Sequence, residues 1–221
     1  IQAAGAAAPE YDFVWTDLTL DAGGWVTGMA AHASTGKVMC RTDVGGVYAL
    51  ESSAPLASEW EWRWLSGSVR GKGAWSTQSL VADDCDDNGN TWLMAVGEPQ
   101  ENSTLDAYDG NGVYRTTDFG QTWTRVFDQD SFAGNGDDRH GGEALHLSKD
   151  CSTAWAAADR GLWRSSRRGD LGSWKRIDVP TAMFNTTAGT GLAAVATSTL
   201  PVYDARQKLV DEEIIWLVGD T

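Results

Sequence analysis

The fold is indicated most clearly by the stretch Gly110-Asn-Gly-Val-Tyr-Arg-Thr-Thr-Asp-Phe-Gly-Gln-Thr-Trp-Thr-Arg-Val126. Residues 113–115 predict a short strand, and Thr116-x-Asp118-x-Gly120-x-Thr122-Trp123 predicts a compact turn into a second strand. Asp118 can accept hydrogen bonds from turn amides two residues on, and Gly120 supplies a backbone conformation that residues with a Cβ avoid. Trp123 offers a large apolar surface that can pack beneath a neighbouring hairpin.

Two interpretations of this turn stay open. The pattern matches the Asp-box, a turn that recurs in β-propellers, notably in sialidases and some polysaccharide hydrolases. The alternative is an ordinary hairpin turn. In both cases the turn is a structural device and says nothing by itself about chemistry.

A repeated order of strands organises the rest of the chain. The pattern Gly-[Val/Leu]-[Tyr/Trp] falls at Gly46, Gly112 and Gly161, spaced 66 and then 49 residues apart, each time within a series of alternating segments. Such units are typical of propeller blades. We predict an all-β fold with four-stranded blades at about residues 24–65, 76–127, 142–178 and 190–221, the last one incomplete, after an N-terminal extension at residues 1–14.

The number of predicted blades is too small for a closed ring. Propellers need at least about four blades, and the sequence stops before its fourth unit has its outer strands. In the third unit, the segment at the position of the box has diverged from the Asp-box pattern and reads Ser165-Ser-Arg-Arg-Gly-Asp-Leu-Gly-Ser-Trp174. We therefore expect the remaining part of the same protein, or a second chain, to complete the propeller, and we favour the former.

The composition limits the possible partners. The 221 residues include 12 Trp and 25 Gly, which suits short strands that present aromatic faces to sugars. Asp and Glu outnumber Lys and Arg by 31 to 17, which gives a net charge of −14. Nucleic acid and anionic membranes both attract positive charge, so we expect neither as a partner. A neutral ligand remains compatible with this charge.

Several features of the sequence indicate a secreted, extracellular protein. No apolar run of about eighteen residues predicts a membrane span. The first ten residues lack the basic and apolar regions of a signal peptide, so we expect a mature terminus left by processing. Sequons at Asn102 and Asn185 predict glycosylation.

The cysteines and acidic residues predict no metal or cofactor. Cys40 lies in an apolar stretch and is expected to be a buried free thiol, whereas Cys85 and Cys151 lie in polar loops and can pair only if those loops adjoin. No Cys/His spacing resembles a zinc site. The acidic cluster lacks EF-hand spacing and is expected to be a solvated loop; it comprises Asp83, Asp84, Asp86 and Asp87.

Asp43, in Arg41-Thr-Asp-Val-Gly-Gly46, is the sharpest candidate for chemistry. It follows the second predicted strand of the first unit, where propeller connections often face the central channel. The adjacent glycines let a ligand approach closely. Asp159 and Asp220 hold the same position in later units, so a turn-forming Asp in every blade is the alternative.

Other residues could bind a sugar. Trp75, in a loop, and Tyr108 could stack on sugar rings, as could the face formed by Trp60, Trp62 and Trp64, although propeller tryptophans more often pack between blades. Arg139 and His140 could line a polar cleft. The alternative is that an ion pair between Arg139 and Glu143 fixes the start of a blade. His32 and His146 lie on predicted strands and are expected to be satisfied core or surface groups.

Taken in order, the motifs resemble the N-terminal part of glycoside hydrolase family 74. They are Gly24-Trp-Val-Thr-Gly, Arg41-Thr-Asp-Val-Gly-Gly-Val-Tyr, Trp62-Arg-Trp-Leu, Gly112-Val-Tyr-Arg-Thr-Thr-Asp-Phe-Gly-Gln-Thr-Trp, Arg139-His-Gly-Gly-Glu and Gly161-Leu-Trp-Arg-Ser. The resemblance covers residues 15–221. It implies a portion of one of two seven-bladed propellers, which hold xyloglucan in the groove between them.

The resemblance also implies a mechanism. Family 74 enzymes cleave the β-1,4-glucan backbone with inversion and use two aspartates, one from each propeller. The general base maps onto Asp43, whereas the general acid belongs to a second propeller that this chain lacks. His140 departs from the family pattern Arg-Gly-Met-Gly-Glu, which bears on the glycan preference. The alternatives are a non-catalytic propeller that binds glycan or protein and a sialidase, for which the chain shows no arginine triad in order.

Overall fold

The computed structural model describes residues 19–20, 24–52, 59–70, 75–97, 111–130, 132, 143–179, 192–203 and 209–219. Within these ranges the chain is almost entirely β-structure. The strands are β1 (Val26–Ala31), β2 (Val38–Thr42), β3 (Val47–Glu51), β4 (Glu61–Trp64), β5 (Thr77–Ala82), β6 (Trp92–Val96), β7 (Gly112–Thr116), β8 (Thr124–Phe127), β9 (Leu145–Leu147), β10 (Ala154–Ala158), β11 (Gly161–Ser165), β12 (Trp174–Ile177), β13 (Leu192–Tyr203) and β14 (Leu209–Gly219). One short 3₁₀ helix, at Ser66–Ser68, follows β4.

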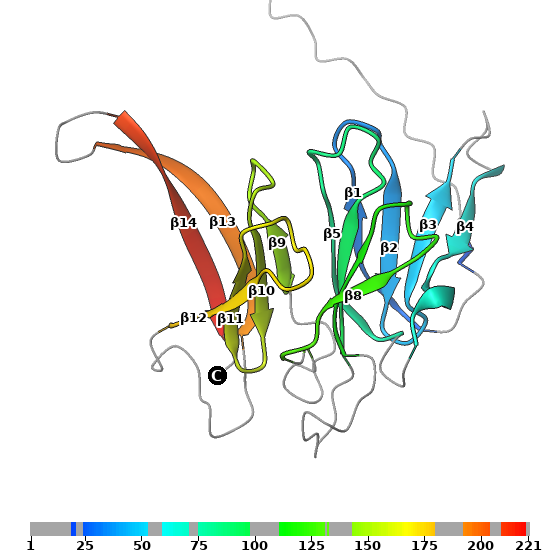
Figure 1. Cartoon of the computed structure of the whole chain (residues 1–221). Coiled ribbons are helices and arrows are strands. Elements are labelled where there is room, and N and C mark those ends of the chain that lie inside the picture. Colours follow the sequence, from blue (N-terminus) through cyan, green and yellow to red (C-terminus); the bar gives the residue numbers. More distant parts are fainter. Residues whose placement is uncertain are drawn as a thin grey trace, which may run out of the picture.

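The strands form sheets in chain order. Three four-stranded sheets have the orders β1-β2-β3-β4, β5-β6-β7-β8 and β9-β10-β11-β12, and β13 pairs with β14 in a fourth, two-stranded sheet. All pairings are antiparallel. Figure 1 shows the sheets side by side, from β1–β4 to β13–β14. The predicted fold class, all-β with propeller-like four-stranded sheets, is confirmed.

The first strand of each sheet lies beside that of the next. Contacts join β1 to β5, β5 to β9 and β9 to β13. This is the arrangement of propeller blades, whose inner strands surround the central axis. Connections at the same end of successive sheets are therefore brought together.

Strand β6 explains why the sheets stack. All five of its residues are buried, as a continuous apolar run predicts for a strand covered on both faces. Trp92, Met94 and Val96 belong to the core shared with the first sheet, whereas Leu93 and Ala95 belong to the core shared with the third sheet. Because successive side chains point to opposite faces, one strand supplies both cores.

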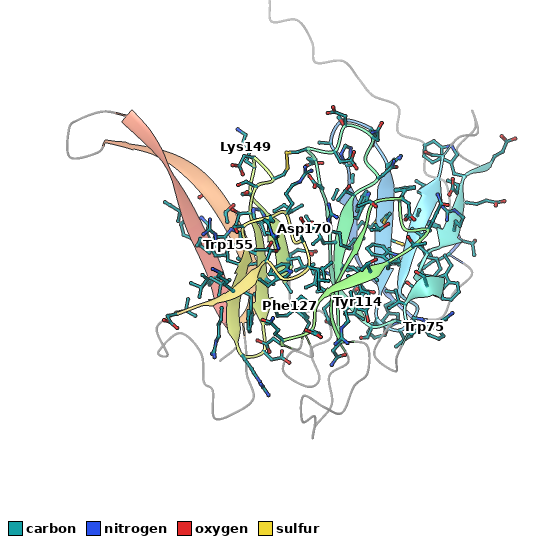
Figure 2. The ribbon with its side chains drawn as sticks, in the orientation of Figure 1. Trp75, Tyr114, Phe127, Lys149, Trp155 and Asp170 are labelled. Carbon is teal, nitrogen blue, oxygen red and sulfur yellow. A yellow bond between two sulfur atoms is a disulfide. The ribbon has the colours of Figure 1, made fainter. Side chains whose placement is uncertain are left out.

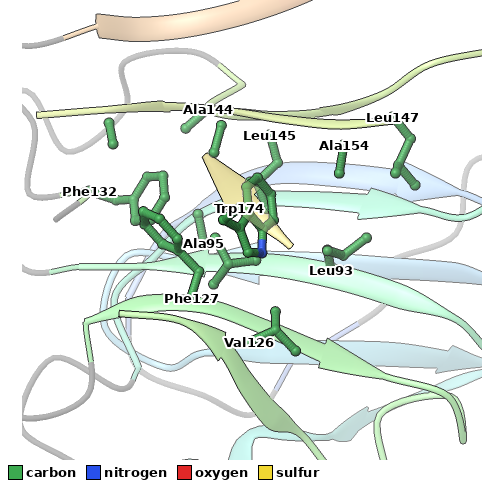
Figure 3. Packing of buried hydrophobic residues seen from close by; sticks show 13 residues of the cluster. Leu93, Ala95, Val126, Phe127, Phe132, Ala144, Leu145, Leu147, Ala154 and Trp174 are labelled. Carbon is green, nitrogen blue, oxygen red and sulfur yellow. The ribbon is translucent and has the colours of Figure 1, made fainter. Parts of the chain in front are cut away.

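The second of these cores lies between the second and third sheets (Figure 3). Phe127 and Trp174 pack there with their ring centroids 5.4 Å apart. Small residues of β10, Ala154, Ala156 and Ala158, let the two sheets approach closely. A third, smaller core contains Trp155 and Leu162 of the third sheet and Val195 of β13.

The turn at Thr116–Trp123 is held by side-chain hydrogen bonds, but the prediction for Asp118 is wrong in one respect, because the amide two residues on, that of Gly120, donates to Thr116 instead. The hydroxyl of Thr116 accepts hydrogen bonds from the backbone nitrogens of Asp118, at 3.2 Å, and Gly120, at 2.9 Å. Asp118 accepts a 2.9 Å bond from the nitrogen of Thr122. Gly120 has a φ of +77°. Trp123 is buried against the first sheet, in the core that includes Leu65.

The corresponding turn of the third sheet keeps this backbone without its aspartate. Ser165 replaces Thr116, and its hydroxyl accepts bonds from the nitrogens of Arg167, at 3.2 Å, and Gly169, at 2.9 Å. Arg168 and Gly169 have φ values of +53° and +82°. The sequence of this turn has diverged, but the hydroxyl that organises its first half remains.

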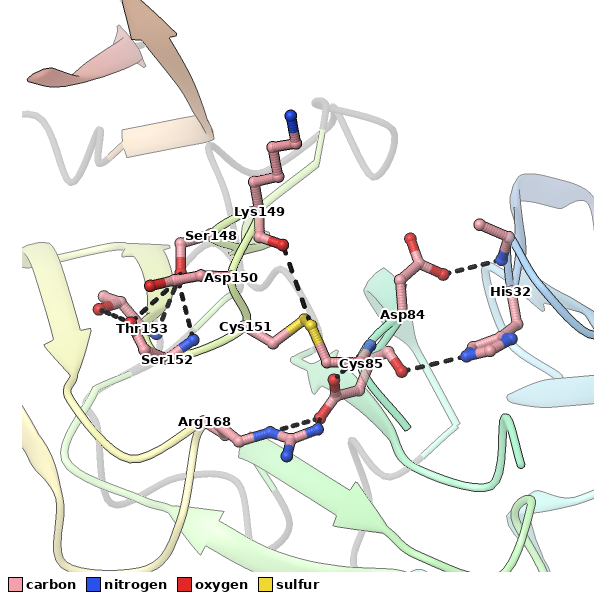
Figure 4. Close-up of a disulfide and its surroundings, with 12 residues drawn as sticks. His32, Asp84, Cys85, Ser148, Lys149, Asp150, Cys151, Ser152, Thr153 and Arg168 are labelled. Carbon is pink, nitrogen blue, oxygen red and sulfur yellow. Dashed lines mark hydrogen bonds and ion pairs between the residues drawn. A yellow bond between two sulfur atoms is a disulfide. The ribbon is translucent and has the colours of Figure 1, made fainter. Parts of the chain in front are cut away.

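Two loops of the second and third sheets are joined covalently. Cys85 and Cys151 form a disulfide (Figure 4), a pairing that the sequence alone does not decide. Cys40 is a buried free thiol, as predicted, and burial raises its pKa to about 12. His32 is also buried, and its Nε2 lies 3.2 Å from the carbonyl oxygen of Asp83.

The prediction of a solvated acidic loop is wrong for Asp83. Its side chain is buried, and its Oδ2 accepts a 2.9 Å hydrogen bond from Nε of Arg168 (Figure 4). The nitrogen of Cys85 donates a 3.1 Å bond to Oδ1. A buried carboxylate is tolerated where a charged partner and hydrogen bonds compensate its desolvation. That partner lies 85 residues away along the chain.

Two further observations complete the fold. Strands β13 and β14, with 12 and 11 residues, are the longest of the described strands. Among the described residues, no helix has the length and apolar character needed to cross a membrane.

Candidate functional site

Asp43 directly follows β2, at the end of the first sheet where β2 turns into β3. The backbone nitrogen of Trp25 donates a 2.8 Å hydrogen bond to its Oδ1, and the nitrogen of Asp43 donates a 3.1 Å bond to the carbonyl oxygen of Trp25. No residue that the structure describes donates a hydrogen bond to Oδ2. Asp43 is half-buried, and its carboxylate is fixed through Oδ1 while Oδ2 has no donor among the described residues.

The neighbouring backbone is shaped around this carboxylate. Gly24 has a φ of +97°, and a Cβ at this position would lie 2.1 Å from Oδ1 of Asp43. The buried hydroxyl of Thr42 accepts a 2.8 Å hydrogen bond from the nitrogen of Gly45 and lies 3.2 Å from the carbonyl oxygen of Gly46. The hydroxyl of Thr42 therefore holds the turn after Asp43 through hydrogen bonds with both Gly45 and Gly46.

Three exposed tryptophans have backbone or side-chain hydrogen bonds to this turn. Trp25, Trp64 and Trp75 are 71%, 46% and 48% exposed. Trp64 and Trp75 meet edge to face with ring centroids 5.8 Å apart, and Nε1 of Trp64 donates a 2.9 Å bond to the carbonyl oxygen of Gly45. The nitrogen of Gly46 donates a 2.7 Å bond to the carbonyl oxygen of Trp75. We call Trp64 and Trp75 the indole cluster.

The indole cluster lies at the end of the sheets opposite to the disulfide. The β1–β2 pairing places Val26 beside Thr42 at the Asp43 end and Ala31 beside Val38 at the other end. Figure 2 shows Trp75 and Lys149, two residues before Cys151, at opposite ends of the sheets. The candidate binding region therefore lies at one end of the sheets, and the disulfide-linked loops lie at the other end.

An ion pair lies beneath the same end of the sheets. Arg41 of β2 is 3% exposed, and its Nη2 lies 3.1 Å from Oε1 of Glu143, which is 53% exposed. Arg139 lies outside the described residues, so the alternative pair between Arg139 and Glu143 stays a prediction. The partner that the structure gives to Glu143 is 102 residues away in the sequence.

The structure brings together only some of the predicted site residues. Asp43 and Trp75 lie at the same turn, through the bond between Gly46 and Trp75. Asp159 occupies the tight turn between β10 and β11, the equivalent position of the third sheet. The predictions for Tyr108, Arg139, His140, Asn102, Asn185 and Asp220 fall outside the described residues.

Sequence reasoning missed Trp25. Its backbone nitrogen holds Asp43 and its side chain is exposed, but in the sequence it was considered only within the motif Gly24-Trp-Val-Thr-Gly. The preceding Gly23-Gly24 pair was the available signal, because paired glycines mark a close backbone approach. Trp64 was considered only as part of an alternating face.

Known proteins resemble the chain in both sequence and fold. No family model matches it. It is 29% identical over 184 residues to a xyloglucanase of a Paenibacillus species, and the alignment covers 78% of this chain and 16% of that protein. It is 28% identical over 171 residues to a xyloglucanase of Hypocrea jecorina, and the alignment covers 75% of this chain and 20% of that protein.

Solved structures share the fold. A family 74 enzyme from Niastella koreensis matches with a TM-score of 0.60 at 22% identity, over 90% of this chain and 27% of that one. The family 74 xyloglucanase of Xanthomonas campestris matches with a TM-score of 0.64 at 23% identity, over 95% of this chain and 29% of that one. The chain is thus similar in sequence to xyloglucanases and in fold to family 74 enzymes.

The similarity covers only part of the length of each of these proteins. The aligned region spans 16% and 20% of the length of the two xyloglucanases. At this identity, the family 74 structures establish the β-propeller architecture of the described sheets and not their chemistry. What the site does must therefore be argued from its residues.

Proposed function

We propose that this chain is part of a secreted glycoside hydrolase that cleaves the β-1,4-glucan backbone of xyloglucan, with Asp43 as the general base. The observation that carries the proposal is the carboxylate of Asp43, held through Oδ1 and without a described donor at Oδ2, in the turn that Trp64 and Trp75 contact. The similarity to two xyloglucanases supports the substrate class.

The geometry of Asp43 suits the activation of water. In an inverting glycosidase, a carboxylate removes a proton from the water that attacks the anomeric carbon, while a carboxylic acid protonates the leaving oxygen. A base must keep one oxygen available to the water and must not rotate away. The bond from the Trp25 nitrogen prevents rotation, and Oδ2 is left to accept the proton.

The indole cluster suits a neutral glucan chain. Sugar rings present apolar C–H faces, which pack on flat aromatic surfaces, whereas their hydroxyls bond to water or polar groups. The edge-to-face contact between Trp64 and Trp75 fixes two indoles in different planes. They can contact neighbouring sugar units, with Asp43 close to the glycosidic bond between them.

The reaction also needs a general acid. Inverting enzymes hold their two carboxyl groups about 6.5–9.5 Å apart. By the resemblance to family 74, the acid is supplied by a second propeller outside this chain, and no residue of the present sequence is assigned to that role. The proposal therefore concerns the whole protein, of which this chain supplies the base and part of the sugar-binding surface.

A second function is favoured by one observation. The indole cluster offers a sugar-binding surface that does not depend on any acid. A non-catalytic glycan-binding propeller would retain this surface and would not use Asp43 in a reaction. The two functions differ in the effect of Asp43→Asn in the complete protein: hydrolysis of xyloglucan is lost in the first, and binding is retained in both.

Secretion and glycosylation are part of the proposal. They rest on the sequons at Asn102 and Asn185 and on the disulfide, since disulfides persist in oxidising compartments. Analysis of the culture medium and mass spectrometry of peptides before and after glycan removal test them. Intracellular protein with both asparagines unmodified would contradict this part.

A further inference from the structure

Arg41 joins three sheets from a buried position on β2. Its Nη1 donates hydrogen bonds to the Thr27 hydroxyl, at 3.2 Å, and to the Thr77 carbonyl oxygen, at 3.4 Å. Its Nη2 donates a 3.1 Å bond to Glu143. These partners belong to β1, to β5 and to the segment before β9. One guanidinium therefore connects the first, second and third sheets.

The space for this guanidinium is built into β1. Gly28 pairs with Arg41 across the β1–β2 ladder. A Cβ at position 28 would lie 2.5 Å from Nε of Arg41. The absence of a side chain at Gly28 lets the guanidinium lie flat against the strand, so its direction toward Glu143 is set by the backbone.

Glu143 is held on its other side as well. The hydroxyl of Ser79, on β5, donates a 2.8 Å bond to its Oε2, and the same hydroxyl accepts a 3.0 Å bond from the nitrogen of Leu145. The carbonyl oxygen of Glu143 accepts a 3.1 Å bond from the nitrogen of Val195, on β13. Glu143 thus relates the first sheet to the three that follow it.

Arg41, Thr42 and Asp43 are consecutive, and each is fixed by a different contact. Arg41 binds across the sheets, Thr42 holds the following turn, and Asp43 is held by Trp25. The two local contacts set the orientation of the Asp43 carboxylate within the first sheet. The bond from Gly46 to Trp75 ties this turn to the segment before β5, and the bond from Arg41 to Glu143 ties the strand end to the segment before β9.

We propose that Arg41 and Glu143 are positioning residues, which place the Asp43 carboxylate relative to the sugar-binding surface of the neighbouring blades. This inference rests on the proposed function of Asp43. A base displaced by about 1 Å still lies in a site that binds substrate, but turnover falls by about 100-fold. The pair therefore acts on kcat and not on KM.

The test uses Glu143→Gln in the complete protein with xyloglucan as substrate. Glutamine keeps the length of the side chain and one accepting oxygen, but it removes the charge that compensates the buried guanidinium and replaces the second accepting oxygen with an NH2 group. We expect kcat to fall by about 10- to 100-fold with KM changed less than twofold. Ser79→Ala removes a single bond to the same carboxylate and is expected to give a smaller loss of kcat, about threefold, again without a change in KM.

The control is Arg63→Gln, which removes an exposed ion pair with Glu51 in the same sheet, at 2.5 Å. It should leave both kinetic constants unchanged. If Glu143→Gln fails to fold, Ser79→Ala and Arg41→Lys test the same contact, because lysine keeps the charge of Arg41 but loses its forked geometry. A wild-type kcat in the folded variants would overturn the inference, as would a rise in KM alone.

Failure of the inference can be told apart from failure of the proposed function. If Asp43→Asn keeps normal turnover, the assignment of the base is wrong, whatever Glu143→Gln does. If Asp43→Asn loses turnover while Glu143→Gln does not, the base stands and the positioning role is wrong. Loss of kcat in both variants, with binding retained, supports both.

Discussion

The backbone nitrogen of Trp25 donates a 2.8 Å hydrogen bond to Oδ1 of Asp43, and the nitrogen of Asp43 donates a 3.1 Å bond back to the carbonyl oxygen of Trp25. This reciprocal pair holds the carboxylate without using its second oxygen. It joins two residues 18 positions apart, across the open end of the β1–β2 hairpin. The carboxylate is therefore part of a preorganised turn.

Gly24 should be essential for that arrangement. Gly24→Ala places a Cβ where it meets Oδ1 of Asp43, so we expect hydrolysis of xyloglucan to fall by about 100-fold. The matched control is Gly36→Ala. Gly36 also has a positive φ, +69°, but no atom lies within 4 Å of its added Cβ. Both variants should lose about 1 kcal/mol of stability from backbone strain. Equal activity in the two variants would refute a steric role for position 24.

Trp75 should contribute to glycan binding. Removing its indole by Trp75→Ala should weaken the binding of xyloglucan oligosaccharides by about tenfold, or ~1.4 kcal/mol, in isothermal titration calorimetry. Trp216→Ala is the control, because Trp216 is similarly exposed, at 58%, but lies on β14 of the fourth sheet. Weakening by Trp216→Ala and not by Trp75→Ala would place the binding surface elsewhere.

The disulfide should stabilise the second and third sheets against each other. Replacing Cys85 and Cys151 by serine opens a link between residues 66 positions apart, and we expect the free energy of unfolding to fall by about 4 kcal/mol in urea titrations. Cys40→Ala should cost only about 1 kcal/mol, since it removes one buried sulfur atom. Three reactive thiols in the denatured, unreduced protein would contradict the pairing.

Asp118 should make stability depend on pH. Burial raises the pKa of Asp118, but hydrogen bonds from Thr122 and Thr116 lower it more, so its pKa lies below the ordinary value of 3.8. The stabilisation is therefore complete above the unfolded-state pKa and is lost as pH falls through the lower, folded-state pKa. Asp118→Asn should cost about 1 kcal/mol at neutral pH, and the difference from wild type should shrink at acid pH.

Parallel urea titrations at neutral pH and below the ordinary aspartate pKa measure this difference. The control is Asp87→Asn, an exposed residue of the loop before β6. It should have little effect at either pH. A difference between Asp118→Asn and wild type that stays constant with pH would show that the ionised carboxylate does not stabilise the turn.

The sequence predicted the strands well because their signals are local. The five buried residues of β6 form one apolar run, and the turn after β7 carries its own hydrogen-bonding groups. The turn after β11 shows the limit of motif matching. Its aspartate is gone, yet Ser165 supplies the hydroxyl that Thr116 supplies in the other turn.

The site was predicted only in part, because its contacts join distant residues. Asp43 was found from its own motif, and Trp75 from its place in a loop. The partner of Glu143, 102 residues away, and the pairing of Cys85 with Cys151 depend on how the sheets stack. Asp83 looked solvated because its compensating cation, Arg168, lies on another sheet. Local patterns carry no information about such pairs.

The central claim is that Asp43 is the general base, and the most direct test is the turnover of Asp43→Asn in the complete protein. General bases contribute about 10²- to 10⁴-fold to the rate, so we expect xyloglucan hydrolysis to fall by about 10³-fold with oligosaccharide affinity changed less than twofold. Asp159→Asn, at the equivalent turn of the third sheet, should hydrolyse xyloglucan normally. Near-normal turnover in Asp43→Asn, or an equal loss in Asp159→Asn, would contradict the assignment.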